Sequence, residues 1–257
     1  MTLFVNNQVT VAIQVILGIT VALMINRARA GQAIPKIRRL AGLDALDEAL
    51  GRATEMGRPV LYVPGGGTMA NAQVMASFSV LGYVARSAAR YDTRLISITS
   101  NVQLYAVMEG IVREAYVVMG RGDSFEPAMV RFLASGWGAY TSAVIGTMKR
   151  EETCANLYFG AFFAETMMLT EIGGLMGAIQ VGSTAQTAQL PFFIAACDYT
   201  LIGEELFAAG AYLSTDPVPK ANLVVLDYFK IATLSTLVIG VLSAAAGNNW
   251  LFTFLRR

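Results

Sequence analysis

The stretch that decides the fold is "RPVLYVPGGGTMANAQ", residues 58–73. A short apolar run ends in three consecutive glycines, and a helical pattern begins a few residues later. Gly65, Gly67 and Ala70 have the spacing G-x-G-x-x-G/A, which in dinucleotide-binding folds forms the turn between the first strand and the first helix. We therefore expect a strand, a tight turn and a helix here, within an α/β domain.

The chain on either side of this stretch alternates between two kinds of pattern. Short runs rich in β-branched and aromatic residues predict strands, and longer amphipathic stretches predict helices. The predicted strands are 59–63, 94–99, 114–119, 155–163 and 190–197, and the predicted helices are 42–56, 68–90, 101–112, 128–149, 163–178 and 200–213. Apolar strands that alternate with helices are typical of a parallel sheet covered on both faces. The expected fold is a doubly wound, mostly parallel, Rossmann-like α/β domain.

Two of the helical stretches have a second interpretation. Residues 72–89 and 132–148 are long and carry few charges, as additional membrane spans would. They are rich in Gly, Ala and Ser, and Arg86 lies inside the first, so insertion into a bilayer would be marginal. We expect both helices to be buried against the sheet and against neighbouring copies of the chain.

The composition limits the classes of function. The chain is 55% hydrophobic and 14% charged, compared with about 25% charged in soluble domains, which indicates membrane segments or surfaces buried in an assembly. It contains no histidine, the commonest general base and metal ligand, so no metal site is expected. Residues 40–218 carry 17 acidic and 10 basic residues, which argues against a nucleic-acid partner. Cys154 and Cys197 are expected to be free, buried thiols.

The first apolar segment is "VTVAIQVILGITVALMI", residues 9–25, close to the length that spans a bilayer. We predict a retained anchor over 1–26 and a basic collar over 27–39. The collar contains five Lys and Arg residues, which place it in the cytoplasm and suit contact with anionic lipid headgroups.

The second apolar segment, residues 222–247, predicts a transmembrane helix over 219–247 and a short tail over 248–257. Asp227 and Lys230 inside it are spaced to pair on one helical face, either as a simple ion pair at the helix end or as part of an ion path. Trp250 would mark the far interface. The expected topology has both termini outside and the α/β domain, residues 40–218, in the cytoplasm.

The glycine loop is also the first candidate for a ligand site. A phosphate-bearing, nucleotide-like ligand at Gly65, Gly66, Gly67 and Thr68 would be met by free backbone N–H groups, with Ser100 and Asn101 nearby from the end of the second strand. The alternative is a tight turn that only allows helix and strand to pack closely. No acidic residue follows the second strand and no Walker-type lysine follows the glycines, so the sequence names no cofactor.

Three further residues are weak candidates for catalysis, and whether the protein is an enzyme stays open. Glu165 and Asp198 are the available general bases in a chain without histidine, and Arg121 would hold an anion. Each has a structural alternative, since Asp198 is a good helix cap and Arg121 lies in a turn. Glu165 and Glu171 lie in an otherwise apolar helix, so each is expected to need a partner such as Arg121 or Arg131.

Three longer motifs carry a resemblance to a known family. "RATEMGRPVLYVPG" (52–65), "FFAETMMLTEIGGLMGAIQVGST" (162–184) and "PFFIAACDYTLIGEELFAAGAYLS" (191–214) are similar to a family of bacterial and archaeal membrane proteins that is filed as a domain of unknown function. The resemblance covers about residues 40–245 and implies a cytoplasmic domain between two spans. It implies no catalytic residues.

These observations predict two alternative functions. The first is a membrane-anchored, homo-oligomeric scaffold, because the low charge content is hard to hide within one domain. The second is a binding domain or enzyme for a phosphate-bearing small ligand at Gly65–Gly67. A channel is the least expected, since two spans with one charge pair provide no polar path.

Overall fold

A computed structural model describes residues 8–30, 41–213 and 217–245. The chain forms two compact units. One comprises residues 38–213, and the other combines residues 1–37 with residues 214–257. The greater part of the predicted basic collar, residues 31–39, and the tail at 248–257 with Trp250 lie outside the described residues.

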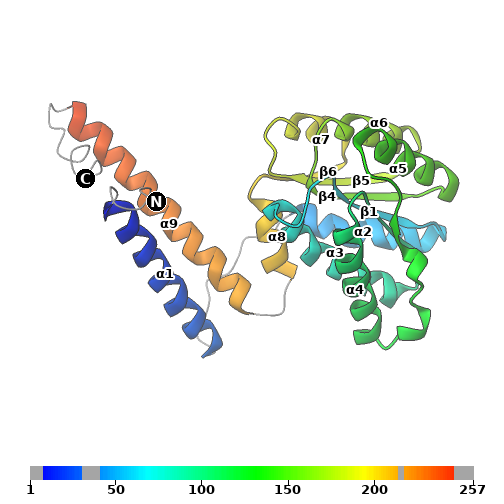
Figure 1. Ribbon diagram of the computed structural model, residues 1–257, viewed down its shortest axis with the longest axis horizontal. Coiled ribbons are helices and arrows are strands. Elements are labelled where there is room, and N and C mark those ends of the chain that lie inside the picture. The colour runs from blue at the N-terminus through cyan, green and yellow to red at the C-terminus, as the bar shows by residue number, and fades with distance from the viewer. Residues whose placement is uncertain (1–7, 31–40, 214–216, 246–257) are drawn as a thin grey trace. The chain divides into compact units, whose positions relative to one another are not determined.

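The unit of residues 38–213 is an α/β domain built on six strands (Figure 1). The strands are β1 (Val60–Gly65), β2 (Leu95–Thr99), β3 (Val130–Phe132), β4 (Ala155–Ala161), β5 (Ile179–Thr184) and β6 (Tyr199–Ile202). The helices are α2 (Ala41–Met56), α3 (Ala72–Tyr91), α4 (Val102–Val118), α5 (Trp137–Glu151), α6 (Glu165–Leu175), α7 (Leu190–Ala196) and α8 (Glu205–Leu213), with short 3₁₀ turns η1 (Gly122–Ser124) and η2 (Pro127–Met129). Every strand pair is parallel, in the order β3-β2-β1-β4-β5-β6. The Rossmann-like parallel sheet is therefore confirmed.

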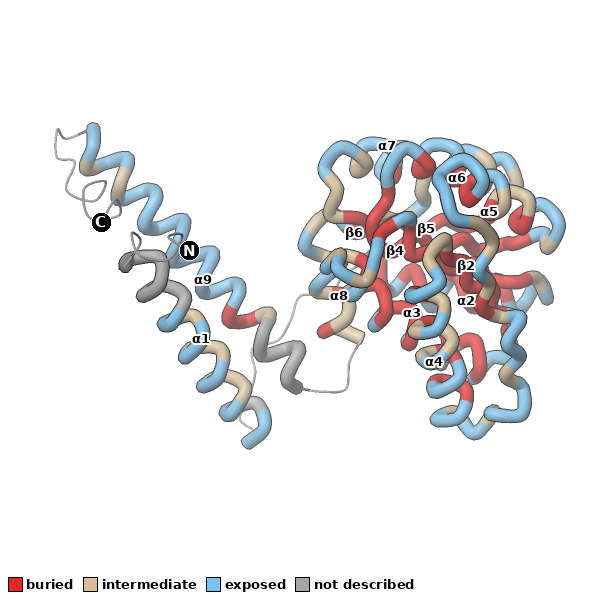
Figure 2. The backbone as a smooth tube through the Cα atoms, viewed as in Figure 1, coloured by how far each residue is buried: buried red, intermediate tan, exposed pale blue. Residues whose placement is uncertain are grey.

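Helices cover both faces of the sheet, and each face has its own apolar core. Residues of α2, α3, α4 and α8 pack on one face, and residues of α5, α6 and α7 pack on the other. The central strands supply alternate side chains to the two cores: Leu61 and Val63 face one, and Val60 and Tyr62 face the other. Figure 2 shows that the inner strands β1, β2, β4 and β5 are buried along their length, whereas the outer sides of the helices are exposed.

Helices α3 and α4 start just after strands, and asparagines define their first turns. The side chains of Asn71 and Asn101 each accept a hydrogen bond from a backbone N–H two residues later. At its far end α3 stops where Asp92 adopts the left-handed conformation, with φ of 58°. Residues 72–89 therefore pack within the domain as helix α3, on the face that α4 and α8 share.

Two of the predicted strands are wrong. Residues 114–119 are the end of α4, and residues 190–196 form helix α7. Both segments are short apolar runs, which have the same pattern in a buried helix and in a buried strand. In α4 the helix that starts at Asn101 simply continues, and in α7 Pro191 lies within the first turn, where proline suits a helix.

Three strands fall where the sequence predicts helix or loop. β3 lies inside the predicted helix 128–149, and β6 lies at the start of the predicted helix 200–213. β5 lies between the predicted helix 163–178 and the predicted strand 190–197, where the polar segment "GSTAQTAQ", residues 182–189, predicts a loop. β3 and β6 are only three and four residues long. Strands this short show too few alternations to be recognised from sequence.

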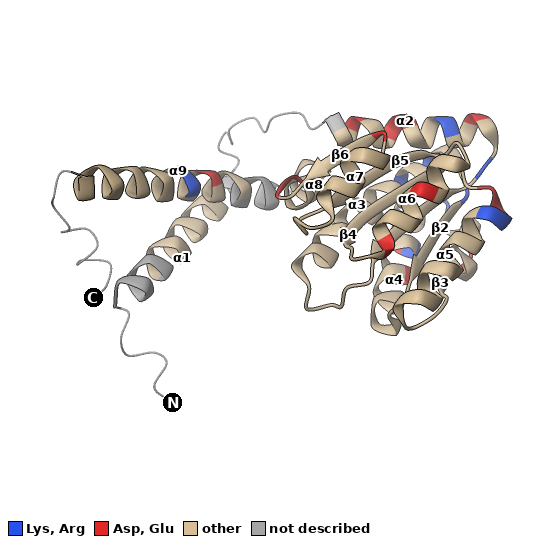
Figure 3. Cartoon of the chain, turned by 90° about the horizontal axis from the view of Figure 1, so that it is seen from above, with Lys and Arg blue, Asp and Glu red and all other residues tan. Residues whose placement is uncertain are grey.

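The second unit contains helices α1 (Gln8–Arg29) and α9 (Pro217–Ala245), which contact each other. Within α9, Leu223–Ala245 is long and apolar enough to cross a membrane, with a mean hydropathy of 1.7. Its hydroxyl groups bond to carbonyls one turn earlier, as Thr233 does to Phe229. Asp227 and Lys230 pair at 3.6 Å, and Figure 3 shows acidic and basic colour next to each other on α9. In α1 the apolar part of the described residues, Val15–Arg27, is shorter than a span.

Candidate functional site

The glycine loop follows β1 and packs against β4, at the carboxyl ends of these two central strands. Gly65 has φ of +80°, and a Cβ atom there would lie 1.9 Å from the carbonyl oxygen of Ala161 on β4. Gly160 has φ of +143°, and a Cβ there would lie 2.2 Å from the oxygen of Pro64. The N–H of Gly66 donates to the oxygen of Ala161 at 3.0 Å. The glycines therefore let β1 and β4 approach more closely than side chains would allow.

A cavity of about 220 Å³ lies beside this loop. Its lining comes from the carboxyl ends of β1, β2 and β4 and from the start of α5: Gly66, Ser100, Gly136, Trp137, Tyr140, Phe163 and Glu165. In the strand order of this sheet, β1 and β4 are the neighbours at which the winding reverses. Open α/β sheets bind their ligands at that position. We call this cavity the switch-point pocket.

Glu165 is the charged residue of the switch-point pocket. It is the first residue of α6 and is 1% exposed. Its Oε2 accepts a hydrogen bond from Trp137 Nε1 at 3.0 Å, whereas its Oε1 has no partner among the described residues. A buried carboxylate oxygen without a donor is costly, although the start of α6 stabilises negative charge there. Oε1 is therefore available to a donor from a ligand.

Tyr140 adds a second unpaired polar group. It is 2% exposed, and its hydroxyl has no partner among the residues that the structure describes. Burial raises the pKa of Tyr140, and the nearby Glu165 carboxylate raises it further. The phenol therefore keeps its proton and is able both to donate and to accept a hydrogen bond.

Two aromatic rings reach the solvent at the switch-point pocket. Trp137 is 53% exposed and Phe163 is 45% exposed. Gly66 lies opposite Glu165, and a Cβ built on it would be 3.4 Å from Oε1. Because Gly66 has no side chain, no Cβ atom contacts Oε1 from this side of the pocket. The pocket thus combines a carboxylate oxygen, a phenol and aromatic surface.

The structure brings three of the predicted site residues together: Gly66, Ser100 and Glu165 all line the switch-point pocket. Gly65 and Gly67 instead make close packing contacts, and a Cβ on Gly67 would lie 2.6 Å from Val74. The four remaining predicted residues lie outside the pocket lining: Thr68, Asn101, Asp198 and Arg121. Asn101 caps α4, and Thr68 is exposed in the loop.

Because Arg121 follows the predicted strand 114–119 and Asp198 follows the predicted strand 190–197, the sequence predicts both at the carboxyl edge of the sheet, beside the glycine loop. This placement is wrong. Asp198 precedes β6, and its Oδ2 accepts a hydrogen bond from the N–H of Gln180 at 2.7 Å, at the amino end of β5. Arg121 follows α4 and pairs with Asp92, just before β2. Both errors have one cause: the end of α4 and helix α7 were predicted as strands. A helix in this fold runs back from the carboxyl edge to the amino edge of the sheet, so the residues that follow it lie at the amino edge.

Glu171 needs no partner, contrary to the prediction, because it is exposed on α6. Its proposed partners are engaged elsewhere. Arg131 pairs with Glu151 at 2.8 Å, and Arg121 pairs with Asp92. The two glutamates of α6 thus differ: Glu165 is buried and Glu171 faces outward.

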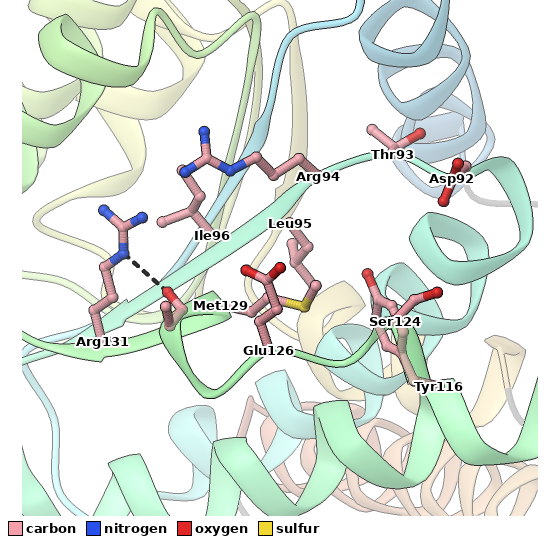
Figure 4. A pocket seen from close by; sticks show the side chains of 11 residues that line it. Asp92, Thr93, Arg94, Leu95, Ile96, Tyr116, Ser124, Glu126, Met129 and Arg131 are labelled. Atoms are coloured by element: carbon pink, nitrogen blue, oxygen red, sulfur yellow. Dashed lines mark hydrogen bonds between the residues drawn. The ribbon is translucent and has the colours of Figure 1, made fainter. Parts of the chain in front are cut away.

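A second cavity, of about 260 Å³, lies at the opposite edge of the sheet, near the amino ends of β2 and β3 (Figure 4). Its charged groups are largely paired with protein groups. Arg131 Nε donates to the oxygen of Ala128 at 3.0 Å, and Arg131 and Arg94 both bridge to Glu151 at 2.8 Å. The hydrogen bond from Arg131 lowers the pKa of Glu151, and its charge and that of Arg94 lower it further. Although this cavity is larger, it offers no buried unpaired group, so the switch-point pocket is the better candidate.

The two cysteines are free, as expected. Cys154 is buried and Cys197 is partly buried. Burial raises the pKa of Cys154, and it raises the pKa of Cys197 to about 12. Neither thiol is therefore an activated nucleophile near neutral pH.

The sheet order and the switch-point pocket define the class of this molecule: a Rossmann-like α/β domain with a small site where the winding reverses. The chain belongs to the DUF6754 family, a domain of unknown function, whose model matches residues 1–255. The resemblance to an uncharacterised family is thus confirmed. No curated protein and no solved structure is significantly similar to the chain.

Proposed function

We propose that this protein is a membrane-anchored binding protein whose switch-point pocket holds a small organic ligand through a positively charged or N–H-bearing group. The observation that carries this proposal is the buried Oε1 of Glu165, which has no partner among the described residues. A donor from a ligand would satisfy it, and a charged donor would do so most strongly.

The other walls of the pocket support the same kind of ligand. Trp137 and Phe163 present aromatic surface beside the carboxylate, and aromatic rings attract ammonium groups by about 0.5–2 kcal/mol. Tyr140 provides a hydroxyl for a second polar group. A volume of about 220 Å³ accommodates roughly seven groups the size of a water molecule, which suits a small amine and is too little for a nucleotide.

The phosphate-bearing ligand expected at the glycine loop is less favoured on electrostatic grounds. A phosphate in front of Gly66 would lie next to the Glu165 carboxylate, and like charges at such a separation repel in a site shielded from water. The N–H of Gly66 is already used by the oxygen of Ala161. Binding of phosphate is therefore tested as the alternative outcome of the experiment below.

The anchoring part of the proposal rests on α9. Leu223–Ala245 is long enough to cross the hydrocarbon core, about 30 Å, at 1.5 Å per residue. We extend this to two spans, because α1 continues through the apolar segment 9–25 and contacts α9. The basic residues after that segment favour a cytoplasmic position for the α/β domain and an outer position for both termini.

The test of binding uses the fluorescence of Trp137 in the full chain. The protein contains two tryptophans, so Trp250→Phe leaves Trp137 as the single reporter. The purified protein in mild detergent is titrated with choline and, separately, with inorganic phosphate at constant ionic strength. Choline has a quaternary ammonium group for the aromatic walls and a single donor, its hydroxyl, for Glu165 Oε1. We expect a saturable change with choline and none with phosphate.

Two glutamine substitutions on α6 complete the design. Glu165→Gln removes the charge but keeps the shape, so it is expected to weaken choline binding at least about 10-fold. Glu171→Gln, six residues further on the exposed side of the same helix, is the matched control and should bind like the parent. Saturation with phosphate alone would restore the anion hypothesis, and equal effects of the two substitutions would show that the pocket is not the site.

A further inference from the structure

The outward surfaces of α6 and α7 are almost entirely apolar. The two helices lie side by side in the layer that covers one face of the sheet (Figure 1). Six large apolar side chains on or next to them are between 41% and 78% exposed: Phe163, Met167, Met168, Leu175, Phe192 and Ile194. We call this surface the α6–α7 face.

The α6–α7 face carries very little charge. The charged residues of α6 are Glu165, which is buried, and Glu171, and α7 has none. By contrast, α2 on the opposite layer carries both acidic and basic residues, as Figure 3 shows. Solvated helix faces normally carry charges, so an apolar face of this kind indicates a surface that becomes buried.

We infer that the α6–α7 face is the interface through which two copies of this chain form a symmetric dimer. This inference is independent of the ligand proposed for the switch-point pocket. It assigns a specific surface to the homo-oligomer that the sequence predicts.

The size of the face supports a second copy as the occupant. The six side chains expose on the order of 600 Å² of apolar surface, at the upper end of the roughly 300–600 Å² of the largest patch on typical monomers. In a two-fold interface each copy contributes the same patch, which gives roughly 1,200 Å² in total, the lower limit for stable specific interfaces. Anchoring both copies in one membrane raises their effective concentration and helps an interface of this size.

The charge pattern argues against the bilayer as the occupant. Surfaces that lie on membranes place Lys and Arg around an apolar centre, because these residues attract anionic headgroups. Neither α6 nor α7 contains a Lys or an Arg. A two-fold axis would instead bury two α6–α7 faces against each other without any need for basic residues.

The experiment compares copy number in full-length variants by native mass spectrometry in mild detergent. Leu175→Glu together with Ile194→Glu places two charges per copy on the α6–α7 face, at positions 78% and 54% exposed. Val117→Glu is the matched control, because Val117 is 60% exposed on α4 in the opposite layer. We expect a dimer for the parent and the control, and a monomer for the double variant, with a dimer dissociation constant raised at least about 100-fold.

Thermal melting separates loss of the interface from loss of the fold, since all three substitutions are at exposed positions and should leave the α/β domain intact. A single variant, Leu175→Gln, provides a milder version if the double variant melts early. A monomeric parent protein at micromolar concentration would overturn the inference. So would a double variant that remains dimeric, because association would then come from the apolar helices α1 and α9.

Discussion

Three buried tyrosines differ in whether their hydroxyl groups have a hydrogen-bond partner. Tyr62 donates to the oxygen of Ser77 at 2.6 Å, and Tyr158 donates to the oxygen of Leu169 at 3.2 Å. Tyr140 in the switch-point pocket has no partner among the described residues. A hydrogen bond within the protein contributes to stability, whereas a buried hydroxyl without one does not. The difference separates a hydroxyl that stabilises the fold from one that the fold does not use.

Substitution by phenylalanine should therefore affect these positions differently. Tyr62→Phe leaves the Ser77 carbonyl without its donor and is expected to lower the free energy of unfolding by about 1–2 kcal/mol. Tyr140→Phe removes an unsatisfied group and should leave the free energy of unfolding unchanged or slightly raised, while choline binding weakens. Chemical denaturation of both variants measures the difference, and a larger loss for Tyr140→Phe would contradict this account of the pocket.

Neighbouring glycines in the loop should also differ. Gly65→Ala forces a side chain into a left-handed conformation and against the oxygen of Ala161, so a loss of about 3 kcal/mol or more is expected. Gly66→Ala meets only side-chain atoms, Glu165 Oε1 at 3.4 Å and Phe163 Cδ2 at 4.0 Å, and should fold normally with weakened ligand binding. Thermal melts of the two variants provide the comparison. Equal melting temperatures would show that the close approach of β1 and β4 is not required.

The sequence predicts part of the candidate site. Gly66 belongs to the glycine motif after β1, Ser100 directly follows β2, and Glu165 is the acidic residue that follows β4 by four positions. Trp137 and Tyr140 were missed, because they lie in the first turns of α5, inside a stretch predicted as one long helix. The glycine pair "SGWG" at 135–138 was the available signal for a helix start there, since Gly136 has φ of +104°.

At the scale of elements, Glu151 ties the end of α5 to two strands. It is the last residue of α5, and it bridges to Arg94, which precedes β2, and to Arg131 in β3. These interactions hold the pKa of Glu151 below its ordinary value. A depressed pKa in the folded state means that the stabilisation is complete above the ordinary pKa, 4.5, and is lost as the pH falls through the lower folded-state pKa.

The expected result is a substitution whose effect depends on pH. Glu151→Gln should lower the melting temperature by a few degrees at pH 7, corresponding to about 1 kcal/mol or less for a partly exposed pair. The difference from the parent protein should shrink as the pH is lowered from 7 through the folded-state pKa, because the parent carboxylate then also takes up a proton. A difference that stays constant over this pH range would mean that the shape of the side chain matters and its charge does not.

The elements that were predicted well share a physical cause. β1, β2 and β4 lie at the centre of the sheet, where burial on both faces selects continuous apolar runs. The edge strands β3 and β6 are short and partly exposed, so their composition resembles that of loops. The sequence of helix α7 has the pattern of a strand. Only Phe193 of its seven residues is buried, so the sequence shows no helical periodicity.

At the scale of the whole molecule, the α/β unit should fold without the helical pair. Both apolar cores are built from residues between 43 and 209, all inside the unit of residues 38–213. We expect a fragment of residues 38–213 to unfold in one cooperative transition within a few degrees of the full chain. Circular dichroism during heating measures this. A fragment without a cooperative transition would show that the helices contribute to the fold.

Membrane attachment is tested on the full chain by extraction. With α9 in a bilayer, the protein should stay in the membrane fraction after alkaline carbonate washing and be released by detergent. Leu234→Arg together with Leu237→Arg, in the middle of that helix, should reduce retention, since each charge at the centre of a span costs about 2.5–3.5 kcal/mol. Ready release of the parent protein by carbonate would contradict the anchor.

The strand order also has a consequence for how the chain is made. β1 is synthesised first and occupies the interior of the sheet; β2 and β3 add outward on one side, and β4, β5 and β6 add outward on the other. No strand has to insert between two that are already paired, so the sheet is able to grow at its edges as the ribosome extends the chain. The last strand and α8 are complete before α9 is translated. The nascent domain thus has all six strands of its sheet before α9 emerges.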